Sequence, residues 1–302
     1  MQFDYKLENK EICILRCYGD AAKVELPTQL EGYPVTGLGK YIFSGSYAKD
    51  DGRKAVYGEM LEEVILPGTI QSIGDYAFYG CRKLKKLSLY QGVREIGGGA
   101  FTGCSKLSGL KISLDGPVGY CFKNVIAELN HEVEVKLSRE GQVLAKLLFP
   151  EYYEEAVENT PARILETRIH GAGYTYRQCF RNGQFKFLEY DSLFYDAKAW
   201  ESEDFCVHLA LYRLEYPWQL TREHASQYME YLTEHSLAAG MWLIRSDRMR
   251  QLDFLSSQIV WQPEVLVQLI GFAREQERME AVGYFMDYKY EHYTNKKKSF
   301  EL

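Results

Sequence analysis

A repeat with a period of 23 residues constrains the fold of this chain more than any other feature of its sequence. Apolar and glycine positions recur at that spacing between residues 61 and 112, and chance does not explain so many matches at one period. The repeated positions are Leu61, Leu84 and Leu107, Gly74 and Gly97, Ala77 and Ala100, Phe78 and Phe101, and Cys81 and Cys104. The period predicts a stack of similar coils, since stacking covers the apolar side that each coil leaves open.

Each repeat begins with the pattern Leu-x-x-Leu-x-Leu, which places apolar side chains on the inner side of a short strand. Successive coils would pair these strands in parallel, about 4.8 Å apart. We expect Phe78 and Phe101 to fill the centres of adjacent coils. A looser copy of the pattern covers residues 24–43, and the alternating residues 5–18 are expected to cap the N-terminal end. The predicted solenoid domain is therefore 1–130.

The order of residues within a coil carries a resemblance. Leu-Pro, Ile-Gly, Ala-Phe and Cys follow one another as in Leu66-Pro67, Ile73-Gly74, Ala77-Phe78 and Cys81. This order resembles the BspA-like leucine-rich-repeat family over roughly residues 20–125. The resemblance implies a binding or adhesion module, often displayed on a cell surface, and it supplies no catalytic residues to carry over.

The strand residues that alternate with the buried ones are the candidate binding site, because they face outwards. These residues are Lys23, Glu25, Glu63, Ile65, Lys86, Ser88, Tyr90 and Lys111. The row mixes charged side chains with the apolar surface of Ile65 and Tyr90, which is suitable for recognising a protein.

Residues 131–190 are predicted to form a β-rich connector. The segment 132–149 alternates apolar and polar residues around an Arg-Glu-Gly turn, which predicts a hairpin. A secondary binding patch is expected after it, since aromatic and arginine side chains are enriched at binding hot spots. The residues of this patch are Tyr152, Tyr153, Arg177 and Arg181.

The same segment contains His170 and Cys179, which suggest an alternative function. An enzyme with a cysteine nucleophile needs a histidine base within hydrogen-bond reach of the thiol. Spacing alone does not show such a pair, and we expect a tight turn with a packed Cys179 instead. No metal site and no catalytic residue is predicted.

From residue 191 the apolar period changes from 2 to about 3.6 residues, which predicts a helical domain over 191–302. The expected helices are 193–200, 203–215, 222–235, 237–245, 247–257, 263–275 and 277–291. Arg248-Met249 recurs 30 residues later as Arg278-Met279. This weak internal repeat suggests stacked α-hairpins of an ankyrin-like or related type. The predicted fold class is thus α+β: solenoid, connector and helical domain.

Charge and composition exclude several classes of protein. The 302 residues carry a net charge of −6, and no basic face of the kind that binds nucleic acid is visible. The opening residues show no secretion signal and no stretch is apolar enough to span a membrane, so we expect a cytoplasmic protein. Seven cysteines without tight clustering indicate free thiols.

The predicted function is a non-catalytic protein-interaction module or scaffold. It would use the outer face of the solenoid sheet, with the helical domain as a possible second surface, and it needs no cofactor. The partner is a protein of unknown identity, and the oligomeric state is open. The alternatives are a structural protein that assembles with copies of itself and an enzyme with a site around His170 and Cys179.

Overall fold

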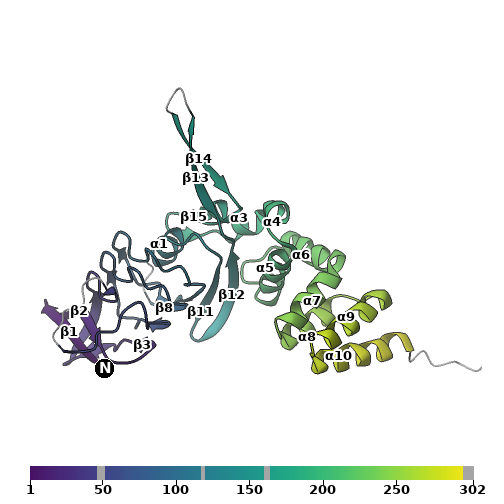
Figure 1. Ribbon diagram of the computed structural model, residues 1–302, viewed down its shortest axis with the longest axis horizontal. Coiled ribbons are helices and arrows are strands. Elements are labelled where there is room, and N and C mark those ends of the chain that lie inside the picture. The colour runs from purple at the N-terminus through teal and green to yellow at the C-terminus, as the bar shows by residue number, and fades with distance from the viewer. Residues whose placement is uncertain (46–51, 117–119, 160–163, 295–302) are drawn as a thin grey trace, which may run out of the picture. The chain divides into compact units, whose positions relative to one another are not determined.

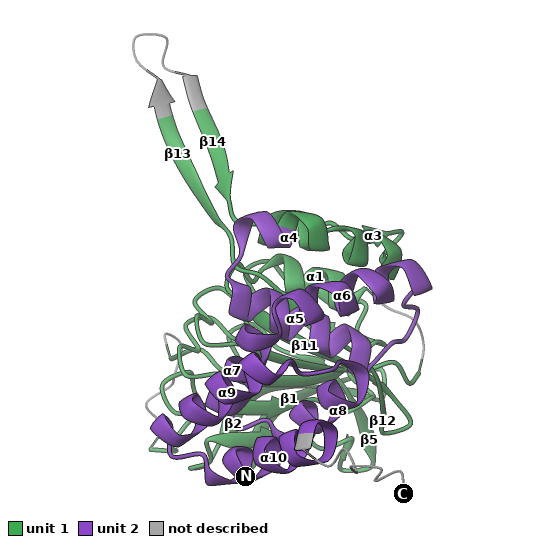
Figure 2. Ribbon diagram, turned by 90° about the vertical axis from the view of Figure 1, so that its right-hand side faces the viewer, with its two compact units in different colours: residues 1–196 green, residues 197–302 purple. Residues whose placement is uncertain are grey.

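A computed structural model describes residues 1–45, 52–116, 120–159 and 164–294 of the chain (Figure 1). The chain divides into two compact units, residues 1–196 and 197–302 (Figure 2). A solenoid comes first and a helical region follows it, which confirms the predicted fold class. Each unit is described by itself.

The main sheet of the first unit contains the strands that the repeat predicts. Its order is β12-β11-β10-β8-β6-β3. Every neighbouring pair is parallel except β11 and β12, which are antiparallel. The bounds are β3 (Lys23–Glu25), β6 (Glu63–Ile65), β8 (Lys86–Tyr90), β10 (Gly109–Ser113), β11 (Val133–Arg139) and β12 (Gln142–Phe149).

A second sheet follows the order β1-β2-β5-β7-β9. Its strands are β1 (Gln2–Glu8), β2 (Glu11–Tyr18), β5 (Tyr33–Leu38), β7 (Ser72–Ile73) and β9 (Glu95–Ile96), and the short β4 (Gln29–Leu30) pairs with β5. The first two strands form an antiparallel hairpin at the edge of this sheet, where the sequence predicts a cap for residues 5–18. The first three coils of the solenoid thus each give one strand to the main sheet (β3, β6 and β8) and one to this sheet (β5, β7 and β9).

The coil interior is a stack of aromatic rings. Phe78 lies between Phe43 and Phe101, with ring centroids 5.2 Å and 5.1 Å apart, and the three side chains are buried. Phe78 and Phe101 therefore occupy equivalent places in adjacent coils, as the 23-residue period predicts. Cys81 and Cys104 are also equivalent, since each thiol contacts the backbone carbonyl of the phenylalanine one coil earlier.

The segment 131–190 differs from the predicted connector. β11 pairs in parallel with β10, so its strand continues the solenoid sheet, and β12 then closes the edge as the second strand of a hairpin. The apolar face of β11 packs on the same core as the coils, because Val133, Val135 and Leu137 are buried. The compact unit accordingly extends to residue 196 instead of ending near 130.

The remainder of the first unit consists of short elements and one long hairpin. The short elements are α1 (Cys121–Ala127), α2 (Gly173–Tyr176), β15 (Phe180–Arg181), β16 (Gln184–Phe185) and α3 (Phe187–Ser192). The long hairpin, β13 (Tyr153–Asn159) with β14 (Ile164–His170), projects from the body of the unit in both views (Figures 1 and 2). The hydroxyl of Tyr190 donates to the carbonyl of Leu148 over 2.8 Å, which fixes α3 against β12.

The second unit is helical. After α4 (Phe194–Trp200), which crosses the boundary between the units, come α5 (Glu203–Glu215), α6 (Arg222–Glu234), α7 (Ser236–Arg245), α8 (Met249–Gln258), α9 (Pro263–Glu275) and α10 (Met279–Lys289). A π-helical segment, η2 (Tyr290–Thr294), follows. These bounds lie close to the predicted ones, except that α8 and α10 each begin two residues later.

The late starts of α8 and α10 have one cause. Asp247 and Glu277 both adopt a positive φ, 55° and 57°, which an α-helix does not permit. The two residues are 30 positions apart, and each stands two residues before its helix. The weak 30-residue repeat in the sequence therefore corresponds to a turn that occurs before both helices.

Candidate functional site

The candidate site is the outer face of the main sheet, where two rows of side chains run across the strands. Strand register places Lys23, Glu63, Lys86, Gly109 and Glu134 in the first row. It places Glu25, Ile65, Ser88, Lys111 and Lys136 in the second. The predicted binding residues of these strands thus lie together on one face, in the order that the repeat predicts.

The core fixes this orientation. Val64, Leu87, Leu110 and Val135 lie between the two rows on neighbouring strands, and all four are buried. Because successive side chains of a strand point to opposite sides, burying these residues forces their neighbours outwards. A slip of one residue would place lysine and glutamate in the core.

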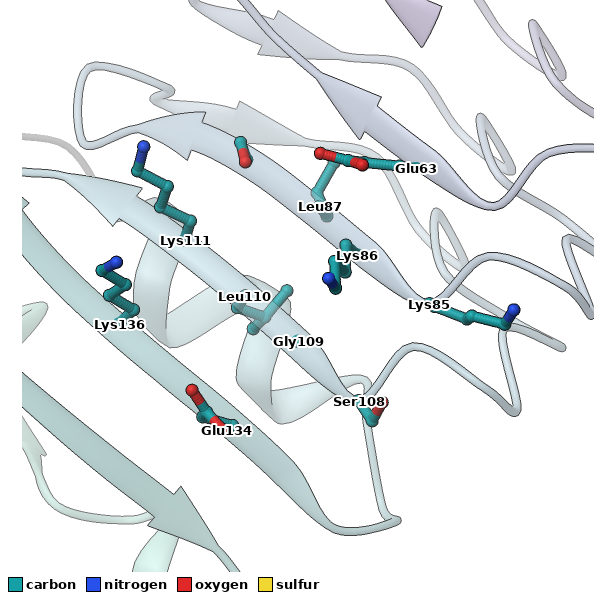
Figure 3. A pocket seen from close by; sticks show the side chains of 11 residues that line it. Glu63, Lys85, Lys86, Leu87, Ser108, Gly109, Leu110, Lys111, Glu134 and Lys136 are labelled. Atoms are coloured by element: carbon teal, nitrogen blue, oxygen red, sulfur yellow. The ribbon is translucent and has the colours of Figure 1, made fainter. Parts of the chain in front are cut away.

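The face is hollowed over Gly109. A depression of about 540 Å³ lies above β8, β10 and β11, and the glycine contributes no side chain to fill it. Lys86, Lys111 and Lys136 stand around it, with Glu63 and Glu134 on opposite borders (Figure 3). Two hydroxyl groups, from Ser88 and Ser108, also line it.

Positive charge dominates the hollow. Glu63 already pairs with Lys23 over 3.1 Å, and Lys85 pairs with Glu62 over 2.9 Å. Within the described part of the chain, Lys86, Lys111 and Lys136 form no ion pair with a carboxylate. The hollow can therefore provide cationic donors to a bound group without first breaking a salt bridge.

The other end of the face is less polar. Ile65 and Tyr90 are half-buried, and the ring of Tyr90 packs against the turn at Gly68. Tyr90 shares a third row with Ser113 and Ser138. An apolar surface and a cationic hollow thus lie within a few strand spacings of each other.

Sequence reasoning did not include Glu134, Lys136, Lys85 and Ser108 in the site. The first two were assigned to a connector because their strand breaks the period. Val135-x-Leu137 follows Leu110-x-Ile112 by 25 residues, two more than the repeat. The shared alternation of apolar residues is the signal that could have placed β11 in the sheet.

The predicted secondary patch is not a single surface, because Arg177 is only 3% exposed. Its guanidinium donates to the backbone carbonyls of Leu129, His131, Pro150 and Gly173. Arg177 therefore holds the base of the long hairpin to the coil, and its assignment as a binding residue is wrong.

Of the other members of the patch, only Tyr152 contacts Arg177: its half-buried ring lies beside Tyr174, with its centroid 5.1 Å from the guanidinium carbon of Arg177. Tyr153 is 56% exposed and stacks on His170 at the start of the long hairpin. Arg181 is exposed and pairs with Glu189 over 3.3 Å.

The structure does not pair His170 with Cys179. The Nε2 atom of His170 lies 3.1 Å from a carboxylate oxygen of Glu155, and the thiol of Cys179 faces the carbonyl of Thr175. Burial raises the pKa of Cys179 to about 12, which disfavours the thiolate that a nucleophile requires. Cys179 is a packed thiol, and the enzyme alternative loses its proposed nucleophile.

The residues that the structure describes contain no group of three or more histidine, cysteine, aspartate or glutamate side chains arranged to hold a metal ion. In the same residues, no helix combines the length and the apolar character that crossing a membrane requires.

Comparison with protein families identifies the coils. Residues 52–139 match the BspA type leucine rich repeat region in six copies. This stretch is a BspA-type leucine-rich-repeat region. The match to the BspA-type repeats ends at Arg139, the last residue of β11, so it includes the strand that sequence reasoning assigned to a connector.

Solved structures of bacterial leucine-rich-repeat proteins are similar to part of the chain. A leucine rich repeat protein of T. pallidum is 33% identical in sequence. The alignment covers 36% of this chain and 50% of the T. pallidum chain, with a TM-score of 0.31. A leucine rich cell surface protein of Faecalibacterium prausnitzii A2-165 is 20% identical, and its alignment covers 47% of this chain and 42% of that protein's chain, with a TM-score of 0.30. The aligned part thus spans half or less of those solved chains. None of the curated proteins matches the sequence.

Proposed function

We propose that this protein is a non-catalytic interaction module that binds a protein partner through the outer face of its main sheet. The single observation that carries the proposal is the two rows of side chains on strands β3, β6, β8, β10 and β11. These rows combine the lysines of the hollow with the hydroxyl group of Ser88 and the apolar surface of Ile65, and Tyr90 adds an aromatic ring in the neighbouring third row. Repeat solenoids commonly use such extended surfaces for binding.

The rigidity of the face supports the same proposal. Its side chains stand on paired strands whose inner residues are buried, so little ordering of the backbone is needed when a partner docks. The five strands from β3 to β11 span roughly 20 Å of stacked sheet. That length suits a peptide segment or one edge of a folded partner.

The cytoplasm is the compartment that we propose. All seven cysteines are free, and most are buried in the coils and helices. Free thiols are the usual state in a reducing compartment.

Partner capture from a native extract tests the function. The tagged wild-type chain is compared with a triple variant of the face, Lys86→Glu, Ser88→Arg and Tyr90→Ala, and with a control that changes exposed residues elsewhere, Tyr79→Ala and Lys123→Glu. The proposal requires that one partner is retained by the wild type and the control and lost by the triple variant. Equal capture by all three proteins would exclude the sheet face, and a partner that is the chain itself would identify an assembly protein.

A further inference from the structure

We propose that the hollow over Gly109 binds the carboxylate of an acidic side chain in a short extended peptide, and that an apolar residue three positions earlier packs on Ile65 and Tyr90. The proposal rests on the proposed function and specifies the chemistry of the partner at the same face. The ligand is thus an apolar-x-x-acidic segment.

Charge selects the acidic residue. Lys86, Lys111 and Lys136 stand on three neighbouring strands, β8, β10 and β11, and form no ion pair with a carboxylate among the described residues. Three like charges around one hollow repel each other, and an anion between them removes that repulsion. A carboxylate can accept from two lysines at once because it has two oxygens.

The hollow has room for an acidic side chain over position 109. Its volume is about 540 Å³, and Gly109 contributes no side chain to it, whereas Lys86 and Glu134 occupy the same row on either side. Ser88 and Ser108 line the same hollow and offer hydroxyl donors to a carboxylate oxygen. The backbone of the ligand would remain outside, above the rows.

Strand spacing sets the distance between the apolar and the acidic residue. Ile65 and Lys111 are two strands apart in the same row, which corresponds to about 10 Å. A peptide in the polyproline II conformation rises about 3.1 Å per residue and returns to the same side every third residue. Positions i and i+3 therefore face the sheet about 9 Å apart, which matches the two anchors.

The surroundings of the hollow disfavour a nucleic acid. Glu63 and Glu134 border it on opposite sides in the first row, where a continuous phosphate backbone would have to pass. The chain as a whole carries a net charge of −6, which repels a polyanion at long range. A single carboxylate between three lysines does not have to pass either glutamate, and its one charge meets less long-range repulsion than a polyanion does.

Fluorescence polarisation with two labelled peptides of identical composition tests the proposal on the full chain. The first, Gly-Ser-Leu-Pro-Pro-Glu-Glu-Ser-Gly, places glutamate three residues after leucine and favours polyproline II. The second, Gly-Ser-Leu-Glu-Glu-Pro-Pro-Ser-Gly, moves the acidic residues next to leucine. We expect the first to bind several-fold more tightly, and its affinity to fall as salt is added.

Variants locate the binding. Lys111→Glu with Lys136→Glu should weaken the first peptide by about tenfold or more, since each lost contact becomes a repulsion. Lys123→Glu on α1 makes the same type of charge change away from the sheet and should leave binding unchanged. If the double variant does not fold, Lys111→Gln provides the milder test and should weaken binding several-fold.

Three results would overturn the proposal: failure of the first peptide to bind, equal binding of both peptides, or tighter binding of a single-stranded oligothymidylate than of the first peptide. The proposed function is tested separately by partner capture. If the triple variant of the face loses its partner while neither peptide binds, the acidic-peptide proposal fails and the interaction function stands. If neither peptide binds and the triple variant retains its partner, the acidic-peptide proposal and the proposed interaction function both fail.

Discussion

Replacing Phe78 by alanine removes the middle ring of the three-ring stack that forms the coil interior. Phe78 is fully buried and stacks on Phe43 at 5.2 Å and on Phe101 at 5.1 Å, so the cavity would open between two coils. Phenylalanine-to-alanine changes in cores cost about 3–5 kcal/mol. Because both faces of this ring are in contact, we expect about 4 kcal/mol in the free energy of unfolding of the first unit.

The assay has to separate the two units. All four tryptophans, at positions 200, 218, 242 and 261, lie in the helical unit, so tryptophan fluorescence reports its unfolding. Amide hydrogen exchange in β6 and β8 reports the solenoid. A loss of about 4 kcal/mol corresponds to a decrease of roughly 8–16 °C in the melting temperature of a unit of this size.

A neighbouring aromatic residue is the matched control. Tyr79 is 40% exposed, so Tyr79→Ala should cost less than about 1 kcal/mol. The stacking account is refuted if amide exchange in β6 and β8 is the same in Phe78→Ala and in the wild type, or if Tyr79→Ala has the larger effect.

Three further perturbations test other parts of the structure. Gly97→Ala would place a methyl group against the backbone of Asp75 and should destabilise the solenoid by about 1–3 kcal/mol, whereas Gly98→Ala meets open space and should be nearly neutral in a thermal melt. Arg177→Lys should cost about 3 kcal/mol because one ammonium group cannot reach all the carbonyls that the guanidinium reaches, while Arg181→Lys should change the melting temperature by little. Burial raises the pKa of Cys17 to about 12, so little of its thiolate is present at pH 8. A thiol reagent should therefore label Cys17 only after unfolding, and rapid labelling of Cys17 in the native protein would contradict its burial.

The solenoid could be predicted from the sequence because one coil imposes its chemistry on the next. Phe78 and Phe101 must fill equivalent spaces, so the residue types recur at a fixed distance and the register of the strands follows. The outward row was predicted by the same logic, since alternation leaves only one side for Lys86 and Ser88.

The strand β11 was not predicted as part of the solenoid sheet, because the repeat changes its period there. Val135 follows Leu110 by 25 residues instead of 23, although β11 pairs in parallel with β10 as the other solenoid strands pair with their neighbours. Lys136 and the hollow over Gly109 were missed for that reason, because the hollow needs β11 as its far wall.

Arg177 shows a second limit. Arginine occurs both at exposed hot spots and as a buried donor to carbonyls, and its neighbours in sequence do not distinguish the two. Only the fold brings the distant residues Leu129, His131 and Pro150 to its guanidinium.

Site-specific photo-cross-linking tests most directly whether the main sheet is the binding surface. A photoreactive residue, p-benzoylphenylalanine, is placed at Ser88 in the middle of the second row and, in a separate protein, at Lys123 on α1. After irradiation with the captured partner, our account predicts a covalent adduct from position 88 and none from position 123. An adduct from position 123 alone would contradict it.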